Sequence, residues 1–299
     1  MAHSHPSNAQ QTKTLGLVLA LTAVFTVVEA VGGWLSNSLA LLADAGHMLG
    51  DLAALGLALV AAWSARRPPD PARTYGYHRA EILAALFNAV ALILIAVFVA
   101  FEAWDRFAHP PDVRWATMLS IGTAGLLVNV IAAWLLHGSQ QNLNMRGVYL
   151  HVLGDLLGSI GVVIAALATG FGGWRLADPI ASAVLSLIIV YGAIRLALQA
   201  GHILMEGTPA HLDAREVQRE LGALRGVAEV HDLHLWTLGG GRTVLTAHLV
   251  TDHAEPHGRL LRRATKMLAS RFDITHTTLQ LEPPDYNIVA SIESGPDDG

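Results

Sequence analysis

The chain has 299 residues, of which 53% are hydrophobic and only 14% are charged, whereas soluble domains average about 25% charged residues. This composition excludes a typical soluble enzyme and a disordered chain. The net charge of −5 argues against nucleic acid as a partner. Because the chain has no cysteine, any metal must be held by His, Asp or Glu, and the 15 histidines are many for so apolar a sequence.

Six stretches are apolar enough to cross a bilayer as helices, which takes about 20 residues each. They cover residues 15–35, 39–63, 81–101, 115–136, 148–169 and 179–198. Six Lys and Arg residues fall in the N-terminus and the even-numbered loops, against three near the odd-numbered loops. This bias predicts a multi-pass protein with both termini in the cytoplasm, and we expect it in the bacterial inner membrane.

The charge density doubles near the end of the last crossing. The first 200 residues hold 10 basic and 10 acidic residues, and the last 99 hold 9 and 14. We expect a flexible N-terminus over 1–14, a transmembrane domain over 15–206, a cytoplasmic α/β domain over 207–285 and a disordered tail over 286–299. The α/β pattern predicts helices over 211–224 and 256–272, and strands over 227–238, 242–251 and 274–282.

One short motif occurs in two of the crossings. His47 and Asp51 lie in the second crossing, and His151 and Asp155 lie in the fifth, so that each His-x₃-Asp pair shares one helix face. An ionised Asp at mid-bilayer costs about 2.5–3.5 kcal/mol, which calls for a compensating partner. If the two helices face each other, two imidazoles and two carboxylates complete a tetrahedral set suited to Zn²⁺. A hydrogen bond within each helix is the alternative, and the recurrence of the motif favours metal.

Small and polar residues accompany this motif in the crossings. Gly46, Gly50, Gly154 and Gly158 are expected to let helices approach closely. Glu29 and Asn129 are candidates for hydrogen bonds between helices, with a cavity or a proton path as the alternative. Asp44 lies near the motif. It is either a residue that surrounds the metal ligands or a residue at the membrane–water interface.

Several runs of the sequence resemble a known family. The runs Ser38–Asp51, Tyr75–Glu81 and Ile203–Pro209, together with the second His-x₃-Asp pair, are similar to the cation diffusion facilitator family over residues 12–285. His at position 47 resembles the zinc-transporting branch. The resemblance implies a homodimeric, proton-coupled exporter with a six-helix membrane domain and a ferredoxin-like, metallochaperone-like cytoplasmic domain, with no organic cofactor and no enzymatic activity.

Three residues of the cytoplasmic part resemble the family's site for a regulatory Zn²⁺. His231, His248 and Glu282 fall on three different predicted strands and are able to meet at one end of the sheet. His234 lies three positions from His231, so strand alternation predicts that it points to the opposite face and is structural.

The resemblance also implies a metal site at the domain junction, with His78 and His276 as ligands. A solvated loop histidine is the alternative for His78. Arg73 and Tyr77 stand where some relatives carry further ligands, which counts against a closed site in that loop.

Competition between protons and Zn²⁺ for the same side chains predicts the transport mechanism. Both His and Asp take up protons, so protonation of the intramembrane site competes with Zn²⁺. We expect an antiporter in the lipid bilayer that exports Zn²⁺, and also Cd²⁺ or Co²⁺, by alternating access. An intramembrane zinc-dependent enzyme would need an open coordination position and commonly a His-Glu-x-x-His string, which does not occur. A passive divalent-cation channel is the other alternative.

Overall fold

The computed structural model describes residues 8–65, 70–137, 143–239, 241–252 and 256–284. Within these ranges, six helices are long and apolar enough to cross a membrane, which confirms the predicted class. Their bounds are α1 (Asn8–Ser36), α2 (Leu39–Ala65), α3 (Ala80–Ala108), α4 (Trp115–His137), α5 (Leu143–Gly172) and α6 (Ala177–Leu204). The chain packs as two compact units, residues 1–60 with 84–198, and residues 61–83 with 199–299.

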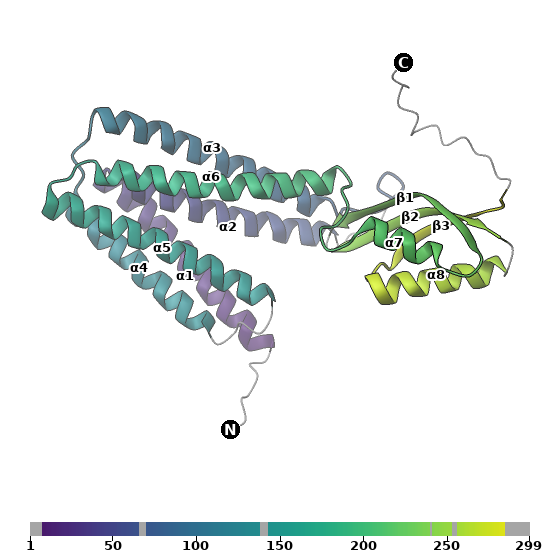
Figure 1. The fold of residues 1–299 in the computed structure, drawn as a ribbon. Helices are drawn as coiled ribbons and strands as arrows, with labels where there is room; N and C mark the ends of the chain where they lie inside the picture. The colour runs from purple at the N-terminus through teal and green to yellow at the C-terminus, as the bar shows by residue number, and fades with distance from the viewer. Residues whose placement is uncertain (1–7, 66–69, 138–142, 240, 253–255, 285–299) are drawn as a thin grey trace, which may run out of the picture. The chain divides into compact units, whose positions relative to one another are not determined.

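The membrane unit contains two groups of three helices. Figure 1 shows α1, α4 and α5 running together, and α2, α3 and α6 running together. Val18, Leu136 and Val152 are buried in the first group, and Leu39 and Val99 are buried in the second. A further buried cluster brings α2, α4, α5 and α6 together, with Leu41, Met118 and Val162 as its largest members.

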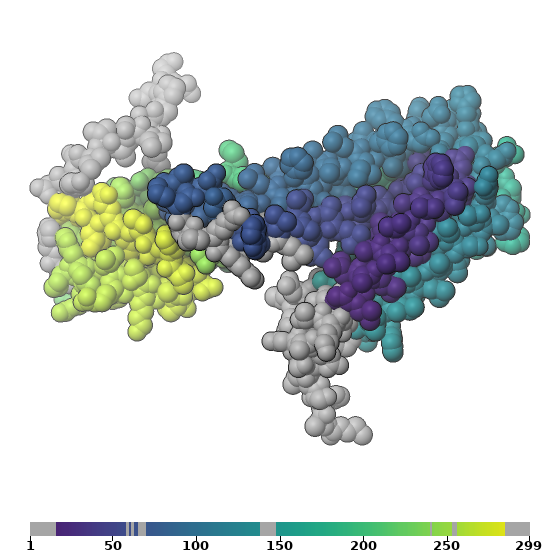
Figure 2. Space-filling view, turned by 180° about the vertical axis from the view of Figure 1, so that it is seen from behind, coloured from purple at the N-terminus to yellow at the C-terminus, as the bar shows by residue number. Residues whose placement is uncertain are grey.

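Helix α1 presents one side to the surroundings of the membrane unit. Figure 2 shows this helix, in purple, along one face of the unit. Its outward side chains are large and apolar, and Val24, Val27 and Trp34 are 64–76% exposed. Such a surface is suited to contact with the hydrocarbon of a bilayer. Lipid tails are as apolar as these side chains, so the hydrophobic effect does not favour their burial.

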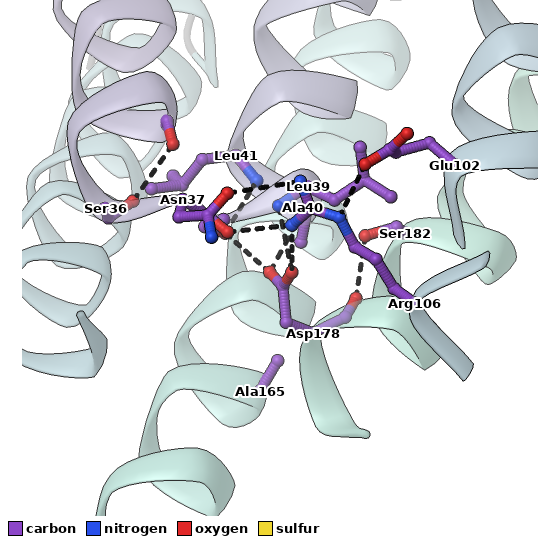
Figure 3. Close-up of polar contacts among 12 residues, drawn as sticks. Ser36, Asn37, Leu39, Ala40, Leu41, Glu102, Arg106, Ala165, Asp178 and Ser182 are labelled. Carbon is purple, nitrogen blue, oxygen red and sulfur yellow. Dashed lines mark hydrogen bonds and ion pairs between the residues drawn. The ribbon is translucent and has the colours of Figure 1, made fainter. Parts of the chain in front are cut away.

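A buried carboxylate from α6 caps the N-terminus of α2 (Figure 3). Asp178, which is fully buried, accepts hydrogen bonds from the Ser38 hydroxyl at 2.6 Å and from the backbone N–H groups of Leu39 and Ala40 at 2.9 and 3.2 Å. Arg106 of α3 lies 3.8 Å away and compensates the negative charge. The first N–H groups of a helix have no partner inside it, so this contact holds the start of α2 against α3 and α6.

The C-terminal domain combines a small sheet with two helices. The elements are α7 (Ala214–Gly222), β1 (Val227–Gly239), β2 (Arg242–Thr251), α8 (His257–Phe272) and β3 (His276–Glu282). The strand order is β1-β2-β3, with β1 antiparallel and β3 parallel to β2. Figure 1 shows α7 and α8 on one face of this sheet, where the buried core includes Val217, Leu245, Leu249 and Leu268. The opposite face is therefore left for polar side chains.

Candidate metal centre

The two His-x₃-Asp pairs of the sequence meet inside the membrane unit. His47 Nε2 lies 3.6 Å from Asp51 Oδ2 and 3.8 Å from Asp155 Oδ1. His151 Nε2 lies 3.1 Å from Asp51 Oδ2 and 3.8 Å from Asp155 Oδ2. Two ligand atoms of one tetrahedral Zn²⁺ are about 3.3–3.6 Å apart, given bond lengths of about 2.0–2.2 Å. We call these four residues the membrane tetrad, and their spacing suits one shared ion.

Two polar atoms of the tetrad are buried without a hydrogen-bond partner. Asp51 Oδ2 is buried and, in spite of its closeness to His151, has no hydrogen bond of acceptable geometry; His47 Nδ1 is also buried without a partner. One atom each from His47, Asp51 and Asp155 lies within 4.8 Å of the other two. The His151 ring stands 5.9 Å from the His47 ring, centroid to centroid, so the fourth predicted ligand lies beside this group of three.

The tetrad lines a cavity of about 720 Å³ between α2, α3, α5 and α6. The remaining wall is mainly apolar and includes Leu92, Ile188 and Gly192. Asp155 is the most buried ligand, with 8% of its side chain exposed, whereas His151 has 46% exposed. An ion in the cavity would thus reach the histidine at the rim before the carboxylate at the base.

Three of the four predicted packing glycines lie close to a neighbouring helix. A Cβ atom on Gly50 would collide with Leu92 of α3, and one on Gly46 would lie 3.1 Å from Ile95. On α5, a Cβ atom on Gly158 would lie 3.3 Å from Asp44. The prediction was wrong for Gly154, which has nothing within 4 Å of that position because it lines the cavity.

The predicted cytoplasmic ligands also come together, on the face of the sheet opposite α7 and α8. His231 of β1 and His248 of β2 are directly paired across the strands, and Glu282 lies on β3. His231 Nε2 is 3.0 Å and His248 Nδ1 is 2.9 Å from the Glu282 carboxylate, which is almost fully buried. Gln280 donates a hydrogen bond of 2.8 Å to the same carboxylate and so orients it. Two imidazoles and one carboxylate fit a divalent metal with an open fourth position.

The prediction that His234 faces away from His231 was wrong. A β-bulge lies between these two residues, because His231 pairs with His248 and His234 pairs with Thr246. Asp232 in the bulge has a left-handed backbone, with φ of 48°, and the extra residue brings His234 back to the same face. The Asp232 carboxylate lies 2.9 Å from His234 Nε2 and 3.5 Å from His248 Nε2.

The predicted junction ligands have different neighbours. His78 Nε2 lies 3.3 Å from a guanidinium nitrogen of Arg242, a cation that would repel a second cation at that nitrogen. His276 stacks edge-on against Tyr75, with ring centroids 5.7 Å apart. Among the residues that the structure describes, the groups of three or more ligands close enough to share an ion belong to the membrane tetrad and to the cytoplasmic cluster. A site at His78 and His276 stays a prediction.

Arg73, in the loop before His78, is paired within that loop. Arg73 Nη1 lies 3.8 Å from Asp70 Oδ2, and its guanidinium stacks over the Tyr77 ring at 4.8 Å. The Tyr77 hydroxyl donates to the same Asp70 oxygen at 3.3 Å. The one carboxylate of this loop is therefore already paired.

Several buried polar residues of the membrane unit lie outside the predicted ligand set. Asn129 of α4 donates a hydrogen bond of 3.0 Å to Ser159 of α5, which confirms a role between helices. Glu29 and Asp44 are 1% and 4% exposed and lie together between α1 and α2. The sequence marks both carboxyls as unusual because they lie in apolar stretches. It does not indicate that the two side chains lie beside each other.

Two family models match most of the chain. The model of the cation efflux transmembrane domain matches residues 15–205, and that of the cation efflux protein cytoplasmic domain matches residues 209–284. Together with the fold, these matches define an integral membrane transporter with a cytoplasmic α/β domain. The chain belongs to the cation efflux family, and the expectation that it is not an enzyme is confirmed by the transporters in that family.

Curated relatives cover nearly the whole chain. The cadmium, cobalt and zinc/H⁺-K⁺ antiporter of Bacillus subtilis (strain 168) is 39% identical, over 96% of this chain and 94% of the relative. The zinc transporter ZitB of Escherichia coli (strain K12) is 43% identical, over 94% and 93%. A solved structure of the metal-bound C-terminal domain of the CzcD transporter from Cupriavidus metallidurans is 44% identical and covers 24% of this chain and 99% of that one, with a TM-score of 0.23.

Proposed function

We propose that this protein exports Zn²⁺ from the cytoplasm in exchange for protons, with the membrane tetrad as the transport site. The observation that carries the proposal is the meeting of two imidazoles and two carboxylates from α2 and α5 in one cavity of the membrane unit. Two carboxylates balance the charge of one Zn²⁺, which lowers the cost of holding the ion at that depth. Names of relatives that include zinc, cadmium and cobalt support the same substrate class.

The chemistry of the tetrad supports exchange rather than passive flow. A ligand must lose its proton before it binds the metal, so a proton arriving from the far side displaces the ion, and the ion displaces the proton on the cytoplasmic side. Alternating access to one site converts this competition into antiport. His and Asp also bind Cd²⁺ and Co²⁺, which we propose as further substrates. A passive channel would conduct without proton movement.

The experiment uses the full chain in proteoliposomes with an acidic lumen and a pH-sensitive dye inside. Zn²⁺ added outside is expected to enter while the lumen becomes alkaline. Asp51→Asn and Asp155→Asn each remove one of four ligands and should lower the rate by about 100-fold or more, equivalent to about 3 kcal/mol. His109→Gln, at an exposed histidine, should transport normally. Zinc uptake without lumenal alkalinisation, or full activity of either aspartate variant, would contradict the proposal.

The cytoplasmic cluster of His231, His248 and Glu282 is proposed to bind a regulatory Zn²⁺. Its support is a buried carboxylate held between two imidazoles, oriented by Gln280.

We also propose the remaining expectations: a homodimer, both termini in the cytoplasm, a bacterial inner-membrane location, and domain limits at residues 15, 206 and 285. A small three-stranded sheet gains stability from pairing with a second copy.

A further inference from the structure

Two carboxyl groups lie buried beside each other in the membrane unit, next to the tetrad but outside its ligand set. Glu29 comes from α1 and Asp44 from α2, and the two side chains are within hydrogen-bond distance. Both residues are almost fully buried. The second oxygen of Glu29, Oε2, has no hydrogen-bond partner.

The residues that face this pair from α4 and α5 include two glycines. On α4 the facing residue is Gly125, where a Cβ atom would lie 3.6 Å from Glu29 Oε1. On α5 it is Gly158, at 3.3 Å from Asp44 Oδ1 by the same measure. Among the charged groups near the pair, Asp155 of α5 acts on both carboxyls and Asp51 of α2 acts on Asp44. The titratable imidazoles of His47 and His151 line the same cavity as Asp44.

A pair in such surroundings must hold a proton. Carboxylates are acceptors only, so a hydrogen bond between two carboxyl groups requires that one of them be protonated. Two ionised carboxylates sharing one buried site repel each other, and hydrocarbon does not solvate them. Cavity and pair are also connected, since Asp44 lines the cavity that contains the tetrad and lies one helical turn before His47.

We propose that Glu29 and Asp44 form a proton-carrying site that is separate from the metal ligands. In the cycle, a proton from water in the cavity binds to the Asp44 carboxylate and is shared with Glu29 while the tetrad is free of Zn²⁺. When Zn²⁺ loads, the same proton returns through Asp44 to cavity water on the cytoplasmic side. The inference rests on the proposed function. It assigns part of the protons that are exchanged for Zn²⁺ to two residues outside the ligand set.

The test compares the parent protein with Glu29→Gln and Asp44→Asn in the full chain. Zinc uptake and lumenal alkalinisation are measured together in proteoliposomes, and zinc affinity is measured by calorimetry in detergent. We expect affinity within about threefold of the parent, with one proton fewer exchanged per Zn²⁺ and a weaker dependence of uptake on lumenal pH. Ser159→Ala removes a neighbouring buried hydroxyl that does not titrate, so it should leave the proton count unchanged.

Two results would overturn the inference. One is an unchanged proton count and pH dependence in both variants, and the other is a loss of zinc affinity above tenfold in Asp44→Asn, which would make Asp44 a ligand. If either variant is unstable, the exchange Glu29→Asp with Asp44→Glu keeps both carboxyls and should restore the parental proton count. Failure of the proposed function is recognised separately, because then the parent protein itself moves no protons with Zn²⁺.

Discussion

At the scale of single residues, the cytoplasmic cluster depends on which nitrogen of His248 carries its proton. Nδ1 faces Glu282 at 2.9 Å, and Nε2 faces Asp232 at 3.5 Å. Both nitrogens therefore face a carboxylate, and a metal bound at Nδ1 would require the proton to be on Nε2, where Asp232 accepts it. Asp232 is thus placed to orient His248 without being one of the three proposed ligands.

Asp232→Ala should weaken zinc binding at the cytoplasmic cluster by about tenfold, the lower end of the range for residues that orient a ligand. Calorimetry on the full chain carrying Asp155→Asn, which disables the tetrad, isolates this site. Asp232→Asn keeps an acceptor oxygen and a residue type that tolerates left-handed backbone, so it should recover most of the affinity. Equal affinity for Asp232→Ala and its parent would refute the role.

The sequence predicts the positions of side chains well where a motif occurs twice. The two His-x₃-Asp strings are sufficient to predict which four side chains lie close together, because fixed helical spacing carries each pair to one face and the repeat indicates that the two faces meet. It does not predict the face of His234, since strand alternation assumes no bulge and the left-handed Asp232 breaks that assumption. The meeting of Glu29 with Asp44 depends on helix packing, which periodicity does not encode.

At the scale of helices and strands, the Asp178 contact fixes the position of α2. The carboxylate is buried among three donors from the start of α2 and is balanced by Arg106. Its removal would leave those donors without their acceptor, whereas Arg106 would keep its ion pair with Glu102 at 3.0 Å. Because α2 carries His47 and Asp51, the same contact holds one half of the tetrad.

Asp178→Ala should lower the free energy of unfolding by about 3 kcal/mol, since a buried donor left unpaired costs about 1–3 kcal/mol. The measurement is chemical unfolding of the full chain in detergent, followed by circular dichroism. Asp105→Ala, at a largely exposed acid on α3, serves as the control and should change the value by less than about 0.5 kcal/mol. A change in Asp178→Ala as small as in this control would show that the cap contributes little.

The predicted elements agree closely with the structure in number and order. The strand over 242–251 is observed with the predicted bounds, and the helix predicted over 256–272 begins one residue later. The membrane helices run past their apolar stretches, as in α3, which continues to Ala108. Hydropathy marks only the part of a helix suited to hydrocarbon, so it could not predict the polar turns at the ends.

At the scale of the whole molecule, zinc should stabilise the protein through two separate places. A ligand that binds only the folded state adds about 2.7 kcal/mol at a concentration 100 times its Kd. Chelation of zinc is therefore expected to lower the melting temperature of the parent protein. Asp51→Asn and Glu282→Gln should each lose part of this difference, and the double variant nearly all of it.

Scanning fluorimetry of the full chain in detergent, with zinc or with a chelator, checks this expectation. His109→Gln should respond to chelation as the parent does. A double variant that still responds fully would mean that zinc stabilises the protein from neither proposed site.

The size of the cavity beside the tetrad has a consequence for selectivity. At about 30 Å³ for each water in the liquid, 720 Å³ is room for on the order of two dozen water molecules. The cavity is therefore large enough to hold a divalent ion with its hydration shell beside the proposed ligands His47, Asp51, His151 and Asp155. In the proposed transport cycle, discrimination between Zn²⁺ and the abundant Mg²⁺ then depends on the exchange of water for imidazole at this site.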